Sequence, residues 1–168
     1  MTVFKQQVAA HIELLQQAQY YLSLVSPADY QQSQPQLSLS SSGSHMRHLL
    51  DHYQALATGL ASGVVDYDQR NRTCRSQFDP AAANQRAIEL IAWLTQLQPQ
   101  QLNQTLSVQM ALGNEPQQAS STLARELLFV SSHSTHHFAM IAISAKLQHY
   151  QLPEHFGLAS ATVSYLSA

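Results

Sequence analysis

The chain has 168 residues, with 8 Lys and Arg against 10 Asp and Glu, a formal net charge of −2, and only 11% charged residues. That length fits a single domain, residues 1–168, that can bury a sizeable core. The weak charge argues against nucleic-acid binding, because a phosphate-binding surface needs clustered Lys and Arg. The lone cysteine, Cys74, excludes a disulfide framework and favours a reducing compartment.

The sequence gives no sign of a membrane or a secretory route. The N-terminus lacks the apolar stretch of a signal peptide. The apolar run at 138–143 is far shorter than the ~20 residues that a membrane span needs. We therefore expect a cytoplasmic protein with no membrane partner.

The first half of the chain predicts two long helices. Apolar residues three or four apart predict a helix over about 4–25, which ends at Ser26-Pro27 because the residue before a proline avoids the α region. Residues 28–41 are rich in Gln and Ser without an apolar period, which is typical of a loop. A second helix is expected over 43–61, with a serine of 42–44 as its N-cap and Gly63 beyond its end.

The second half predicts two more helices and one interruption. Residues 64–78 read as an irregular polar segment, and a helix over 80–97 follows, with Asp79 as N-cap and Pro80 in its first turn. The helical period breaks over 99–120, where Gly113-Asn114 indicates a short extended excursion or hairpin. A last helix is expected over 121–148, and the tail 152–168 should pack across one end. Together these elements predict an all-α fold, an antiparallel four-helix bundle.

Histidine is the one compositional excess, with nine residues, and six of them lie in two helical clusters: His45, His48, His52, His133, His136 and His137. His133 and His137 are four residues apart on one helical face, within an apolar seam. Such a pair can bind one metal ion from a single helix. The alternative is a pair of core histidines satisfied by other partners, since two buried imidazoles otherwise cost desolvation twice.

A third ligand from the second helix would favour the metal site. The helical angle prefers His45 or His52, because His48 lies off the centre of that helix's apolar stripe. A helix in a bundle touches two neighbours, however, so its flanks also face inward, and periodicity leaves all three open. His136 is displaced from His133 and His137 and is expected to be a neighbour or a substrate-side residue. Phosphate-loop, carboxylate-bridged diiron and His-Glu-x-x-His motifs are absent.

Four stretches together resemble a known family. They are Ser-Gly-Ser-His-Met-Arg-His-Leu-Leu-Asp-His-Tyr (42–53), Asp-Tyr-Asp-Gln-Arg-Asn-Arg (66–72), Arg-Glu-Leu-Leu-Phe-Val-Ser-Ser-His-Ser-Thr-His-His-Phe-Ala-Met-Ile (125–141) and Pro-Glu-His-Phe-Gly-Leu-Ala-Ser-Ala-Thr (153–162). The combination resembles the DinB-like (DinB/YfiT-like) proteins, bacterial four-helix bundles with a three-histidine metal site. The resemblance selects His48, the histidine before a leucine in the second helix, and joins it to His133 and His137 as ligands of one divalent metal ion.

The resemblance also implies an activity. Some relatives are metal-dependent transferases that join low-molecular-weight thiols to electrophiles, which implies a small-molecule substrate, such as a thiol, and a site with open coordination positions. The alternatives are a non-catalytic, stress-related metal-binding bundle and a metal-assisted hydrolase. Imidazoles suit Zn, Ni and Fe alike, so the sequence leaves the metal open.

Two further expectations accompany this site. The family-like segments place Asp51, Arg70, Arg72 and Arg125 near the histidines, as groups that could orient the ligands. Surface ion pairs are the alternative interpretation of these charges. The family likeness and the low surface charge also predict a homodimer.

Overall fold

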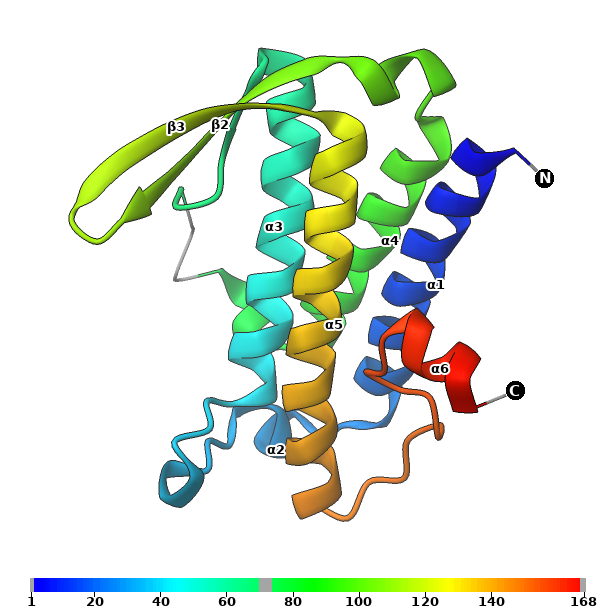
Figure 1. Ribbon diagram of the computed structural model, residues 1–168. Coiled ribbons are helices and arrows are strands. Elements are labelled where there is room, and N and C mark those ends of the chain that lie inside the picture. Colours follow the sequence, from blue (N-terminus) through cyan, green and yellow to red (C-terminus); the bar gives the residue numbers. More distant parts are fainter. Residues whose placement is uncertain (1, 70–73, 167–168) are drawn as a thin grey trace.

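The computed structural model describes residues 2–69 and 74–166, and it is built around four long helices (Figure 1). These are α1 (Val3–Leu24), α3 (Ser42–Ser62), α4 (Pro80–Gln96) and α5 (Leu123–Leu147). The sequence predicts all four, because each carries an apolar stripe long enough to show the helical period. No helix within the described ranges combines the length and apolar character needed to cross a membrane.

Shorter helical elements complete the chain: α2 (Pro27–Gln31), α6 (Ser160–Leu166), and 3₁₀ turns at Pro35–Leu37, Arg75–Gln77 and Pro99–Asn103. The expectation of a loop over 28–41 is therefore wrong in part. Ser26 caps α2 by accepting the Asp29 N–H at 3.1 Å, and Pro27 occupies its first turn. A five-residue helix made by local capping is too short to show an apolar period, which is why the sequence pattern misses it.

A three-stranded sheet corrects the all-α prediction. Strand β1 (Val64–Asp66) pairs in parallel with β2 (Thr105–Leu112), which pairs antiparallel with β3 (Glu115–Thr122). The β2–β3 hairpin turns at Gly113, whose φ of 65° suits glycine. The sequence predicts an extended excursion or hairpin over 99–120, and the structure has the hairpin there. The prediction that 64–78 is irregular is wrong for β1. Three residues are too few to show strand alternation, although Val65 is fully buried.

The helix directions also depart from a simple antiparallel bundle. Gly43, at the start of α3, lies against the backbone of Gln77, just before α4. At the other end, the Leu60 carbonyl of α3 accepts a hydrogen bond from Gln104, just after α4, at 2.9 Å. Helices α3 and α4 therefore run in the same direction, and α5 runs opposite to both (Figure 1). The long connection 63–79 allows α4 to begin beside the start of α3.

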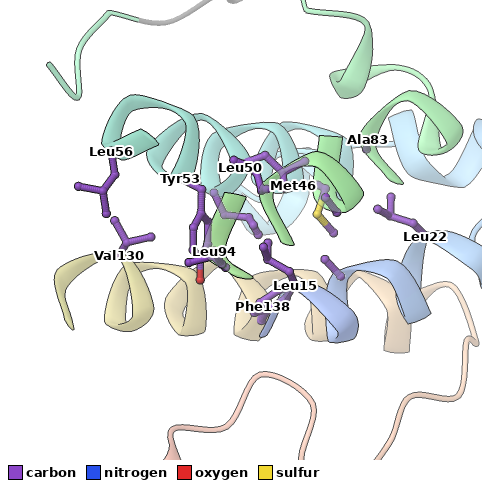
Figure 2. Close-up of a cluster of buried hydrophobic side chains, with 14 of the residues drawn as sticks. Leu15, Leu22, Met46, Leu50, Tyr53, Leu56, Ala83, Leu94, Val130 and Phe138 are labelled. Atoms are coloured by element: carbon purple, nitrogen blue, oxygen red, sulfur yellow. The ribbon is translucent and has the colours of Figure 1, made fainter. Parts of the chain in front are cut away.

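The core lies between the four long helices. Figure 2 shows side chains from all of them meeting in one apolar cluster, with Leu15 of α1, Tyr53 of α3, Leu94 of α4 and Phe138 of α5 all fully buried. Full burial of one leucine or phenylalanine stabilises a fold by roughly 1.5–3 kcal/mol. This cluster holds α3 and α5 at a fixed separation.

The contact between α3 and β1 gives a first prediction. A methyl group added at Gly59 would lie 2.8 Å from the carbonyl oxygen of Val64, a backbone atom that cannot move aside locally. Replacing glycine by alanine inside a helix normally stabilises it by about 0.8–1.0 kcal/mol. Gly59→Ala should instead destabilise the protein by about 1–3 kcal/mol, as overpacking does. Urea denaturation measures the change, and a stabilised variant would contradict the packing.

A buried histidine in α1 gives a second prediction. His11 is 2% exposed, and its Nδ1 lies 2.9 Å from the Tyr53 hydroxyl. Burial lowers the pKa of His11 to about 4. In the unfolded chain His11 titrates near pH 6.5, its ordinary value. Between about pH 4 and 6.5 the unfolded state therefore binds more protons than the native state does. The titration of His11 therefore leaves the free energy of unfolding unchanged above pH ~6.5, and lowers it by roughly 3 kcal/mol as the pH falls to 4.

The variant His11→Asn keeps a polar atom at the Nδ1 position but cannot titrate. Its free energy of unfolding should fall less steeply than that of the wild type between pH 6.5 and 4. Parallel curves for the two proteins would mean that His11 has the same pKa in both states.

Candidate functional site

The sheet sets the register between the two histidine-bearing helices. Strand β1 follows α3 after Gly63, and β3 ends at Thr122, the N-cap of α5, while β2 pairs with both strands. His48 lies 14 residues before the end of α3, and His137 lies 14 residues after the start of α5. At a rise of 1.5 Å per residue, His48 and His137 each lie about 21 Å along their helix from the end that adjoins the sheet. Because α3 and α5 are antiparallel, the two histidines are level with each other. His52 and His133 are level in the same way, because each lies ten residues from that end of its helix.

Three of the six clustered histidines converge. Each of His48, His133 and His137 offers a ring nitrogen, and these three atoms lie within 4.8 Å of one another. The Nε2 atoms of His133 and His137 are 3.1 Å apart. His137 is buried, whereas His48 and His133 are half-buried. The group can therefore be reached from solvent while one side of it lies against the core.

The spacing of the nitrogens fits a metal ion. An ion about 2.0–2.1 Å from two imidazole nitrogens separates them by roughly 2.9–3.4 Å at the angles of octahedral and tetrahedral coordination. The distance of 3.1 Å between the Nε2 atoms of His133 and His137 falls within that range, and it is also the length of a hydrogen bond between the two rings. The ligand atom of His48 lies within 4.8 Å of both. Neutral imidazoles are the donors that Zn, Ni and Fe accept, so the residues present could hold such an ion.

The electrostatics keep His137 uncharged. Burial, followed by the nearby imidazoles of His133, His48, His45 and His136, lowers the pKa of His137 to about 2. Its ring is therefore neutral at any pH near 7, with one nitrogen lone pair available. A metal ligand must be deprotonated, and here the fold supplies that state before any ion arrives.

The other clustered histidines have different surroundings. His45 points its Nδ1 at Nδ1 of His137, 3.0 Å away. The Nδ1 of His52 contacts the backbone carbonyl of His48 at 2.9 Å, and its ring stacks on Tyr67 with centroids 5.0 Å apart. His136 meets the His137 ring edge-on, at 5.1 Å between centroids. Within the described residues, the convergent group contains His48 and neither of the two histidines that the helical angle favours.

Aromatic side chains form one flank of this group, which the sequence did not reveal. Phe129 stacks on His133 with ring centroids 5.7 Å apart, and Tyr67 contacts both Phe129 and His52. The Tyr67 hydroxyl donates at 2.7 Å to Glu126, a fully buried carboxylate, and burial raises the pKa of Tyr67. Tyr67 lies one residue past β1, in a segment without periodicity, so only the fold brings it here.

The expected charged neighbours are distributed differently. Both carboxylate oxygens of Asp51 are engaged by arginines, Arg47 at 2.9 Å and Arg86 of α4 at 3.0 Å, which is the ion-pair interpretation of this residue. Arg125 does approach the site, because its guanidinium lies 5.5 Å from the Phe129 ring and 3.0 Å from Glu126. The remaining two, Arg70 and Arg72, lie outside the described residues.

Comparisons with known proteins place the fold. No family model matches the chain. Among curated proteins, it is 31% identical over 107 residues to "FK506-binding protein 5" of Rhizopus delemar, a match that takes in 61% of this chain and 28% of that protein. Among solved structures, it matches a DinB-like protein (YjoA) of Bacillus subtilis with a TM-score of 0.65 and 18% identity, over 90% of this chain and 98% of the other. The chain therefore has a DinB-like fold.

The position of Asp51 gives a third prediction. Because its carboxylate pairs with Arg47 and Arg86, Asp51→Ala should lower the free energy of unfolding without changing zinc affinity measurably. The loss leaves two arginines without their partner, which should cost about 1–3 kcal/mol. Zinc titration against a chromophoric chelator and urea denaturation give the two values. A large loss of zinc affinity would instead connect Asp51 to the histidine group.

Proposed function

We propose that this protein binds one divalent metal ion through His48, His133 and His137 and uses it to join a low-molecular-weight thiol to an electrophile. The observation that carries the proposal is the convergence of three ring nitrogens within 4.8 Å, contributed by two helices that are distant in sequence. The 3.1 Å distance within one pair matches the spacing that shared coordination requires.

The partial exposure of the group favours a reactive site over a closed structural one. Structural zinc sites usually fill all four positions with protein ligands, whereas catalytic sites keep three and leave one open. Here three ligands are present and two of them are half-buried. A bound divalent ion would supply Lewis acidity, which lowers the pKa of a thiol or water held beside it.

The chain's own residues prepare that chemistry. Three neutral imidazoles leave the charge of the ion uncompensated, so an anion such as a thiolate is the favoured further ligand. The low pKa of His137 keeps that ligand neutral. On one side, Phe129 and Tyr67 cover the histidines with apolar ring surface, which restricts water there and strengthens electrostatic interactions.

The thiol-transfer reaction itself is supported by the resemblance of the sequence segments to DinB-like proteins. The structural likeness to the Bacillus subtilis protein supports the fold at 18% identity, and a fold alone carries no activity. Zn, Ni and Fe are the ions that this donor set would take.

The ligand set gives a fourth prediction. Substituting alanine for His48, His133 or His137 should each weaken zinc binding by well over the ~10–100-fold that is typical of losing a supporting residue. His136→Ala is the matched control, because His136 lies on the same helix and touches the His137 ring, and it should lose much less. Isothermal titration of tag-free protein measures the affinities. If His52→Ala loses the metal while His48→Ala keeps it, the ligand from α3 has been misassigned.

Activity is tested by supplying glutathione or cysteine together with a chromogenic electrophile to the zinc-, nickel- and iron-loaded protein. Loaded wild-type protein should consume the thiol faster than protein carrying His48→Ala. Metal binding without thiol consumption would support the non-catalytic bundle, and ester or amide cleavage without thiol would support a hydrolase. Either result would contradict the transfer reaction while leaving the metal site intact.

A further inference from the structure

We infer that His45 is a positioning residue for the metal site: its Nδ1 accepts a hydrogen bond from Nδ1 of His137 and so keeps Nε2 of His137 unprotonated and aimed at the ion. This inference rests on the proposed function. It adds to the three ligands a residue that never touches the metal.

The first support is the contact itself. His45 lies three residues before His48 on α3, in the turn that begins at the N-cap Ser41. Its Nδ1 is 3.0 Å from Nδ1 of His137, and the two ring centroids are 5.2 Å apart. Among the described residues, the other nitrogen of His45 is buried and has no hydrogen-bond partner. The contact of Nδ1 with His137 is therefore the hydrogen bond that this ring makes within the described residues, and for Nδ1 to accept, the proton of His45 must sit on the buried Nε2.

The second support is the proton count on His137. A neutral imidazole carries one proton, on either Nδ1 or Nε2. The Nε2 atom of His137 faces Nε2 of His133, the other ligand on α5, at 3.1 Å, and we therefore take Nε2 as the atom of His137 that binds the ion. Metal binding needs the lone pair on that atom, so the proton must sit on Nδ1. An acceptor beside Nδ1 stabilises that tautomer, and His45 is that acceptor.

The third support is the arrangement around metal-bound histidines in general. Such a histidine almost always donates its second ring N–H to a carboxylate, a carbonyl or water, which fixes the ring orientation. The nearest acid in sequence, Asp51, is engaged by two arginines instead. An imidazole nitrogen is also a good acceptor when its ring carries the proton on the opposite nitrogen. His45 therefore fills the position that a carboxylate often takes.

The test compares two substitutions of His45. His45→Leu fills the space of the ring with an apolar side chain and removes the hydrogen-bond acceptor. His45→Asn places its side-chain oxygen where Nδ1 was, so it can still accept the proton of His137. Zinc affinity is measured by competition with a chromophoric chelator, and thermal unfolding in excess chelator checks that each metal-free variant folds. His136→Leu serves as the matched control, because it changes a ring that touches His137 from another side.

We expect His45→Leu to weaken zinc binding by about 10–100-fold and His45→Asn to recover most of that loss. In the zinc-loaded wild type, NMR should show a hydrogen-bonded proton on Nδ1 of His137, and His45→Leu should remove its downfield shift. Unchanged affinity in His45→Leu, or equal losses in both variants, would overturn the inference while leaving the metal site in place. A wild-type protein that binds no zinc would overturn the proposed function, and this inference with it.

Discussion

The register between α3 and α5 is the constraint on which the site depends. The small sheet ties the last turn of α3 to the first turn of α5, because β1 follows one helix and β3 leads into the other. From that shared end, His48 and His137 stand at equal heights on antiparallel neighbours. A slip of one residue along either helix would turn its imidazole by about 100° and shift it by about 1.5 Å. The sheet therefore positions the histidines, although none of them lies on a strand.

Burial then defines the chemical state of the imidazoles. Moving charged groups into an apolar interior is costly, so burial lowers the pKa of His45 and of His137 and favours both as neutral rings. The cost falls further when each ring nitrogen has a partner, and His137 has one on each side, His133 and His45. A neutral ring keeps a nitrogen lone pair that can accept a hydrogen bond or bind a cation. The packing that forms the core thus also brings together three residues that could hold a metal ion.

The sequence predicts part of this arrangement and leaves part out, for physical reasons. Long helices repeat their apolar positions often enough to be recognised, and His133 and His137 stand out because they interrupt such a stripe. On α3 the helical angle favours His45 or His52, and His52 is buried, but the nitrogens that converge with those of His133 and His137 include one from the half-buried His48. Resemblance to a family, and not periodicity, selected His48. Tyr67 and Glu126 meet only through the fold, across 59 residues of sequence.

The most direct test of the account is the metal content and anomalous diffraction of the protein purified without an affinity tag. The account predicts one divalent ion per chain, with an anomalous peak about 2.0–2.1 Å from a ring nitrogen of each of His48, His133 and His137. A protein that retains no metal after incubation with zinc, nickel or iron, and whose crystals show these three rings bonded only to one another, would contradict it.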